Sequence, residues 1–75
     1  MWNIFIHNDD YNTMDFVIIV LVQVFKISNQ EAITIMLEAH NNGIALIKSE
    51  PKEHAELHQE QLQSFGLIST IEPAD

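Results

Sequence analysis

Residues His7–Phe16, with the sequence HNDDYNTMDF, concentrate polar side chains between two apolar runs. Asn8, Asp9 and Asp10 stand in succession, and a tyrosine and a methionine follow. A chain reversal needs only one or two such polar residues. The surplus indicates that a ligand binds here, although an Asx-turn and a helix cap, in which Asn8 and Asp10 bond their own backbone, would also account for part of it.

The neighbouring carboxylates do not match two common kinds of site. A calcium-binding EF-hand loop beginning at Asp10 would need glycine at its sixth position and glutamate at its twelfth, where the chain has Asp15 and Leu21. General acid–base catalysis would need a nucleophile and a base nearby, and no such constellation accompanies the carboxylates. The pattern therefore favours binding over catalysis, and we expect neither enzymatic activity nor a cofactor.

Three histidines are further candidates for ligands or hydrogen-bonding groups. His54 and His58 are four residues apart, a spacing that can hold zinc on one helix face. Ala55 breaks the H-E-x-x-H pattern of metalloproteases and no third ligand is evident, so a solvated pair without metal is favoured. His40 falls in the last turn of a predicted helix, where a histidine interacts well with the helix dipole.

Two methionines, Met14 and Met36, are ordinary gap-filling core residues in the simplest interpretation. They could instead surround an apolar pocket beside the carboxylates, together with Ile6, Val17, Ala39 and Ile68. An apolar pocket with a few convergent polar groups at its mouth is the usual form of a small-ligand site. The residue types alone leave both interpretations open.

The composition narrows the class of partner. The 75 residues make one domain (1–75), and 47% of them are hydrophobic, which is enough for one core. Three lysines, no arginine and eleven acidic residues give a formal net charge of −8. We therefore expect no nucleic acid and no anionic membrane as partner, because binding phosphate draws on Lys and Arg. The charge favours a cationic ligand or a basic partner surface, or it serves solubility alone.

Two further features concern location. The chain has no cysteine, which fits a reducing, intracellular environment. The apolar run Phe16–Val22 is far shorter than the ~20 residues that span a bilayer.

The sequence predicts three strands and three helices. Residues 2–7 are rich in β-forming side chains and predict a strand. Three helices are predicted from their caps: from Asn12 or Thr13 to about Lys26, from the capping box Ser28-x-x-Glu31 to Asn41-Asn42-Gly43, and from Pro51 to about Phe65. The stretches GIALIKS and LISTI predict two more strands. The order βααβαβ indicates an α+β fold, a sheet layered with helices.

The facing of the helices follows from apolar spacing. In the first helix the core stripe is predicted at Phe16, Val17, Val20, Leu21 and Val24, which leaves Ile18, Ile19 and Val22 as an exposed apolar strip. In the second helix the buried face is Ala32, Ile35, Met36 and Ala39. In the third helix Ala55, Leu62 and Phe65 are expected to point inward and Glu53, Glu56 and Glu60 outward.

Several ordered blocks resemble the ClpS family of adaptor proteins, which recognise N-degrons. The blocks are N-D-D-Y-x-x-M-[DE]-F-V at 8–17, A-x-x-x-M-L-x-A-H at 32–40, Gly43 with the strand after it, E-x-A-E at 53–56 and T-I-E-P at 70–73. Together they cover nearly the whole chain. The resemblance implies a three-stranded antiparallel sheet carrying three helices, and a non-enzymatic adaptor of Clp ATP-dependent proteases.

The resemblance also implies a site. Asn8, Asp9 and His40 would hold the free α-amino group of another protein. Its bulky hydrophobic first side chain, Leu, Phe, Tyr or Trp, would enter a pocket formed by Ile6, Asn12, Met14, Val17, Met36, Ala39 and Ile68, with Met14 as a gate at the rim. Glu53 matches the face that docks on the N-terminal domain of a Clp AAA+ unfoldase.

The chain departs from the family pattern at several positions. Thr13 stands where proline is usual, Asn12 where threonine is common, and Ala39 where a larger aliphatic residue, usually valine, is found. His58 replaces a lysine that often helps to dock the unfoldase. The flexible N-terminal extension of family members is expected to be absent.

The resemblance implies a location in the cytoplasm, or in the stroma of an organelle of bacterial origin. The alternative function is a protein-interaction module or an inhibitor that occupies the unfoldase without delivering a degron. A small metal-dependent enzyme is the least favoured of the alternative functions.

Overall fold

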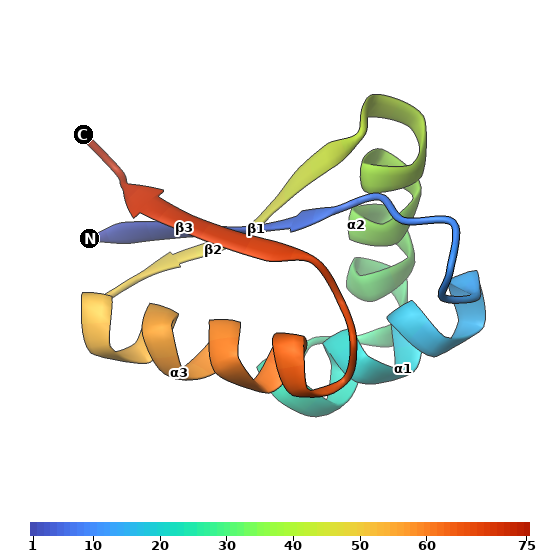
Figure 1. Cartoon of the computed structure of the whole chain (residues 1–75), viewed down its shortest axis with the longest axis horizontal. Coiled ribbons are helices and arrows are strands. Elements are labelled where there is room, and N and C mark those ends of the chain that lie inside the picture. The colour runs from blue at the N-terminus through green and yellow to red at the C-terminus, as the bar shows by residue number, and fades with distance from the viewer.

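The computed structural model describes residues 1–75 as a three-stranded sheet with three helices. The order is β1 (Trp2–His7), α1 (Met14–Phe25), α2 (Asn29–Asn42), β2 (Ile44–Glu50), α3 (Lys52–Ser64) and β3 (Ser69–Pro73) (Figure 1). The predicted α+β class and the order βααβαβ are confirmed.

The helix ends coincide with the predicted caps. The Thr13 hydroxyl accepts a hydrogen bond from the Phe16 amide (3.2 Å) at the start of α1. The Ser28 hydroxyl accepts from the Glu31 amide (3.1 Å) and donates to the Glu31 carboxylate (3.3 Å), so the two residues of the predicted capping box contact each other at the start of α2. Gly43 ends α2 in the left-handed conformation, with a φ of 88°.

The sheet has the order β2-β1-β3, and both pairs of strands are antiparallel. Side chains along β1 alternate between the two faces, so Ile4 and Ile6 are buried while Phe5 and His7 lie on the opposite face. The helices pack on the face of Ile4 and Ile6, and we call the other face the open face of the sheet (Figure 1). The pairing of β1 with β2 shifts by one residue between Ile4 and Phe5, so Ile47 of β2 has no partner on β1.

The chain ends lie together at one end of the sheet. Trp2 pairs with Pro73 in the β1–β3 ladder, and the Ala74 amide donates to the Met1 carbonyl (3.0 Å). Figure 1 shows both ends on one side of the molecule and the loop after β1 on the other.

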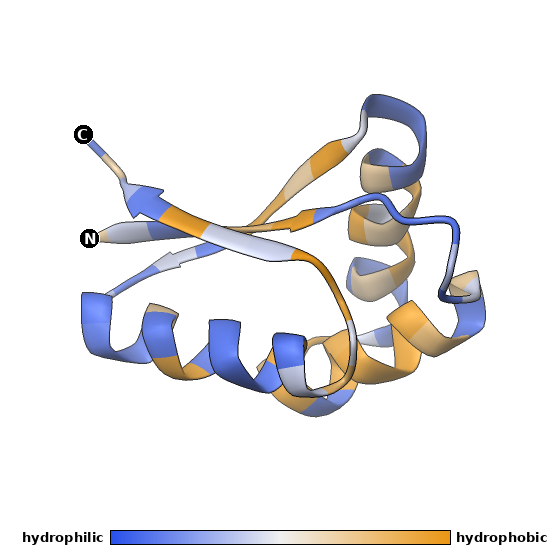
Figure 2. Cartoon of the chain, in the orientation of Figure 1, coloured by the Kyte–Doolittle hydropathy of each residue, from blue (hydrophilic) through white to orange (hydrophobic).

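The facing of α1 differs from the prediction. Val20 and Leu21 are buried as expected, but Ile18 and Val22 are half-buried against the core, so only Ile19 of the predicted strip is exposed. Phe25, which the stripe omitted, is buried. The reason is that α1 packs against both α2 and α3 and therefore buries a wider arc; Figure 2 shows it hydrophobic along most of its length.

The other two helices follow the prediction with one exception. Ala32, Met36 and Ala39 of α2 are buried, and so are Ala55 and Leu62 of α3. Phe65 is exposed instead of inward, because it lies just beyond α3, where its ring packs edge-on against Phe16 with the centroids 6.5 Å apart.

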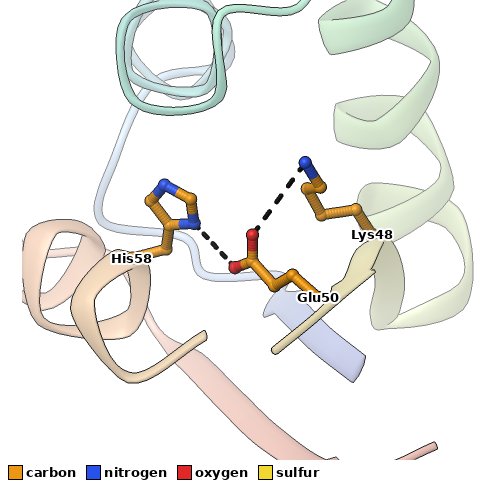
Figure 3. A network of polar contacts seen from close by, with 3 residues as sticks. All are labelled: Lys48, Glu50 and His58. Carbon is orange, nitrogen blue, oxygen red and sulfur yellow. Dashed lines mark hydrogen bonds and ion pairs between the residues drawn. The ribbon is translucent and has the colours of Figure 1, made fainter. Parts of the chain in front are cut away.

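A buried carboxylate joins β2 to α3. Glu50 Oε1 lies 2.6 Å from His58 Nδ1, and Glu50 Oε2 lies 3.9 Å from Lys48 Nζ (Figure 3). The Glu50 side chain is only 4% exposed and that of His58 is 21% exposed. The His58 ring also packs on Phe25 of α1, with the ring centroids 4.6 Å apart. This contact therefore connects three elements through one histidine.

Unlike the Glu50 carboxylate, another buried polar group has no hydrogen-bond partner. The Ser69 hydroxyl of β3 is buried, and no hydrogen-bonding group of the chain contacts it. An unsatisfied buried hydroxyl costs about 1–3 kcal/mol.

We expect Ser69→Ala to leave the free energy of unfolding unchanged or to raise it by about 1 kcal/mol, measured by urea denaturation. A loss above about 1 kcal/mol would show that the hydroxyl is hydrogen-bonded in solution.

Candidate functional site

A cavity of about 240 Å³ opens at the end of the sheet opposite the chain ends. Three segments form its wall: the end of β1 with the loop after it, the first turn of α1 and the last turns of α2. The lining residues are Ile6, His7, Asn8, Asp9, Asp10, Asn12, Thr13, Met14, Val17, Met36, Ala39 and His40. Its volume is below the roughly 300–1,000 Å³ of pockets for drug-sized ligands, so it suits a single large side chain.

The inner wall of the cavity is apolar. Ile6 of β1 and Met36 and Ala39 of α2 are buried, and Val17 of α1 is half-buried. Met14 lies in the first turn of α1 and is exposed. Met36 and Ala39 are three residues apart on one helix face, which is why both reach the same cavity.

The polar loop is held in shape by one carboxylate. Asp9 Oδ1 accepts hydrogen bonds from the amides of Tyr11 (3.0 Å) and Asn12 (2.8 Å). The Asn12 side-chain nitrogen lies 3.3 Å from both Asp9 oxygens and donates to the Gly66 carbonyl (3.0 Å). The Asx-turn predicted for Asn8 and Asp10 is thus made by Asp9, which stands two positions before the Tyr11 amide and three before the Asn12 amide.

Asn8 and His40 are available to a ligand. Both are exposed, and neither side chain is hydrogen-bonded within the chain. The Asn8 amide donates to the carbonyl of Gly43 (2.9 Å), the residue that ends α2. This bond ties the loop to the end of α2, where His40 stands in the last turn. Hydrogen-bond acceptors from two distant parts of the chain therefore meet at the mouth.

The predicted pocket needs one correction. Every predicted amine-site and pocket residue lines the cavity except Ile68, which lies on the open face of the sheet. The alternation of the last strand explains this, since Leu67 and Ser69 are buried and the side chain between them must point the other way. His7, Asp10 and Thr13 line the cavity without having been assigned to it, and Asp10 could have been included because it adjoins Asp9.

The third helix carries the remaining candidates. Glu53 is exposed in its first turn, away from the cavity. The prediction of a solvated pair holds for His54, which is exposed, but not for His58, which faces Glu50. No group of three or more His, Asp or Glu side chains is placed to hold a metal ion. No helix combines the length and the apolar character needed to cross a membrane.

An apolar recess with hydrogen-bond acceptors at its rim is the usual form of a binding site for a ligand that has one apolar group beside a hydrogen-bond donor. The family model described as "ATP-dependent Clp protease adaptor protein ClpS" matches residues 1–70. The chain belongs to the ClpS family, whose members are adaptors and not enzymes.

Curated relatives agree over almost the whole chain. The ClpS adapter of Synechococcus elongatus is 45% identical over 75 residues, which cover 99% of this chain and 79% of the relative. The chloroplastic adapter CLPS1 of Chlamydomonas reinhardtii is 42% identical over 74 residues, or 97% of this chain and 46% of that protein. Relatives thus include bacterial and chloroplastic adapters of the Clp protease.

A solved structure has the same fold. Agrobacterium tumefaciens ClpS2, bound to L-phenylalaninamide, superposes with a TM-score of 0.88 at 31% identity, and the match covers 96% of this chain and 94% of that one.

Proposed function

We propose that this chain binds proteins by their free α-amino group and bulky hydrophobic first residue, and brings them to a Clp-type unfoldase for proteolysis. The observation that carries this proposal is the meeting of Asn8 and His40 at the mouth of an apolar cavity sized for one side chain. The ligand of the related ClpS2 supports it, because L-phenylalaninamide combines a free α-amine with a benzyl group.

The polar rim has the chemistry that an α-ammonium group requires. Such a group has three donor hydrogens, and burying it partly without acceptors would be costly. Asn8 offers an amide oxygen, and the imidazole of His40 offers a ring nitrogen. Asp9 supplies negative charge, and because its Oδ1 is already bonded to the loop backbone, its position is fixed before the ligand arrives.

The apolar wall sets the preferred first residue. Ile6, Met36 and Ala39 form a wall without polar side chains, which suits Leu, Phe, Tyr and Trp. Met14 stands at the rim as a gate, and we expect it to hinder Ile and Val because their side chains branch next to the backbone.

A peptide panel tests the proposal. Labelled peptides that differ only in a first residue of Phe, Leu, Ile, Ser or Glu are titrated with the protein and followed by fluorescence anisotropy. Phe and Leu are expected to bind at least tenfold more tightly than Ser and Glu. Equal affinities across the panel would contradict degron recognition.

Ala39 is expected to favour the largest side chains. Ala39→Val narrows the cavity by two methyl-sized groups, and one methylene of fit is worth about 0.8 kcal/mol. The variant should therefore lower the ratio of Phe affinity to Leu affinity by about fourfold. The two dissociation constants are measured side by side by anisotropy. An unchanged ratio would show that Ala39 does not limit the depth of the cavity.

Delivery requires a second surface. Exposed Glu53 on α3 is proposed to dock on the N-terminal domain of the unfoldase, in the cytoplasm or in an organelle stroma. The alternative, an inhibitor that occupies the unfoldase without delivery, is distinguished by the rate at which a Phe-initiated substrate is degraded. An adaptor raises this rate and an inhibitor lowers it.

A further inference from the structure

The open face of the sheet carries an exposed apolar patch. Ile44, Leu46 and Ile68 are 40%, 44% and 51% exposed, and Phe5 between them is half-buried. Phe5 pairs with Leu46, and the Ile68 carbonyl accepts from the amide of His7, which pairs with Ile44. These registers place Phe5, Ile44, Leu46 and Ile68, here called the open-face patch, side by side on β1, on β2 and just before the start of β3.

The open-face patch lies at the cavity end of the sheet. Toward the chain ends the same face turns polar, where Asn3 pairs with Ser49 and with Glu72. None of the four patch residues carries a charge in this strongly acidic chain. Apolar side chains therefore gather on the open face only where the strands approach the cavity.

His7 connects the open-face patch to the cavity. It lines the cavity, and it is also the β1 residue next to Ile44 and Ile68 on the open face. Its Nε2 lies 2.8 Å from the hydroxyl of Thr70 on β3, which fixes the ring over the sheet. His7 is therefore the one residue that belongs both to the cavity lining and to the row of open-face side chains that includes Ile44 and Ile68.

We infer that the open-face patch binds apolar side chains of the same substrate chain, shortly after the first residue that fills the cavity. This inference rests on the proposed function. An extended chain advances about 3.3 Å per residue, so the third and fifth residues of the substrate are about 6.6 Å apart, the spacing of His7 and Phe5 along β1. Both side chains would face the sheet, since alternate residues of an extended segment share one side.

The chemistry of this segment follows from the patch. Each apolar side chain that covers it removes apolar surface from water, which is the source of the added affinity. An acidic segment would be repelled by the net charge of −8. Substrates with small apolar residues at positions three and five should therefore bind more tightly than serine versions with the same first residue.

The test compares two labelled peptides, FGVSVGK and FGSSSGK, with a fluorophore on the lysine. We expect the valine peptide to bind about fivefold more tightly to the unaltered protein. Leu46→Ser and Ile68→Ser should reduce this preference to less than about twofold. Leu57→Ser, which removes an equally exposed leucine from α3, serves as the matched control and should keep the fivefold preference.

L-Phenylalaninamide separates this inference from the proposed function, because it fills the cavity and has no downstream residues. If it competes equally well in all variants while the valine preference is lost only in Leu46→Ser and Ile68→Ser, the inference stands. If it competes but the two peptides bind equally to the unaltered protein, the inference is overturned and the proposed function is retained. Failure to compete at all would reject the proposed function itself.

A second copy of the chain could cover the open-face patch instead. Sedimentation equilibrium of the unaltered protein and of Leu46→Ser decides this. A monomer in both cases agrees with substrate binding. A dimer that Leu46→Ser dissociates would assign the patch to self-association and overturn the inference.

Discussion

Acetylation of the α-amino group is expected to weaken binding of a Phe-initiated peptide at least about a hundredfold. The modification removes the positive charge and leaves one donor of three, so Asn8 and His40 lose their partners. A hydrogen bond to a charged group contributes about 1.5–3 kcal/mol, and a hundredfold loss corresponds to about 2.7 kcal/mol. Anisotropy with the free and acetylated peptides at pH 7 measures the difference.

Two controls separate charge from bulk. A peptide with a 3-phenylpropanoyl group in place of its first phenylalanine lacks the amine without adding an acetyl group. It should bind as weakly as the acetylated form. Raising the pH through the ordinary α-amine range of about 7.7–8.0 removes the ligand's proton, so affinity should fall above pH 8. Equal binding of free and acetylated peptides would end the degron proposal, whatever the first side chain.

His58→Ala is expected to lower the free energy of unfolding by about 3 kcal/mol. The change leaves the Glu50 carboxylate buried, with only Lys48 at 3.9 Å nearby. It also removes the ring that packs on Phe25 of α1. Leaving a buried carboxylate without its hydrogen-bond partner costs about 1–3 kcal/mol or more, because the group is charged, and the lost packing of the ring on Phe25 adds to this cost.

Urea denaturation followed by circular dichroism measures this loss. His54→Ala, which removes an exposed histidine one turn earlier, is the matched control and should change stability by less than about 0.5 kcal/mol. The double variant Glu50→Leu with His58→Leu removes both polar partners and should recover most of the stability. A His58→Ala protein as stable as His54→Ala would show that the contact drawn in Figure 3 contributes little.

Local signals predicted the order of elements correctly because they act over three or four residues. Thr13, Ser28 and Gly43 end or begin helices through hydrogen bonds to their near neighbours, and such contacts are readable from spacing alone. The facing of α1 was less predictable, because nearly every residue of that helix is apolar. Its orientation depends on which neighbours pack against it, and the periodicity of its own residues does not contain that information.

In the candidate site, too, features that depend on contacts between distant residues were harder to predict than local ones. The pairing of Asn8 with the end of α2 depends on a bond to Gly43, far along the chain, and only the family resemblance pointed to it. Ile68 was grouped with the apolar pocket residues, but Leu67 and Ser69 on either side of it are buried, so its side chain points to the opposite face. The Glu50–His58 contact was missed because it joins a strand to a helix, and neither residue has a local pattern that requires the other.

The meeting of the two chain ends has a practical consequence for handling this protein. Because Met1 and Ala74 are bonded to each other at the end of the sheet remote from the cavity, a biotin tag or a fused reporter at either end would leave the mouth unobstructed. The same proximity makes a circularly permuted chain feasible, with the ends joined by a short linker and new ends opened elsewhere. A sensor surface carrying the protein by its C-terminus would thus present every cavity to the solution.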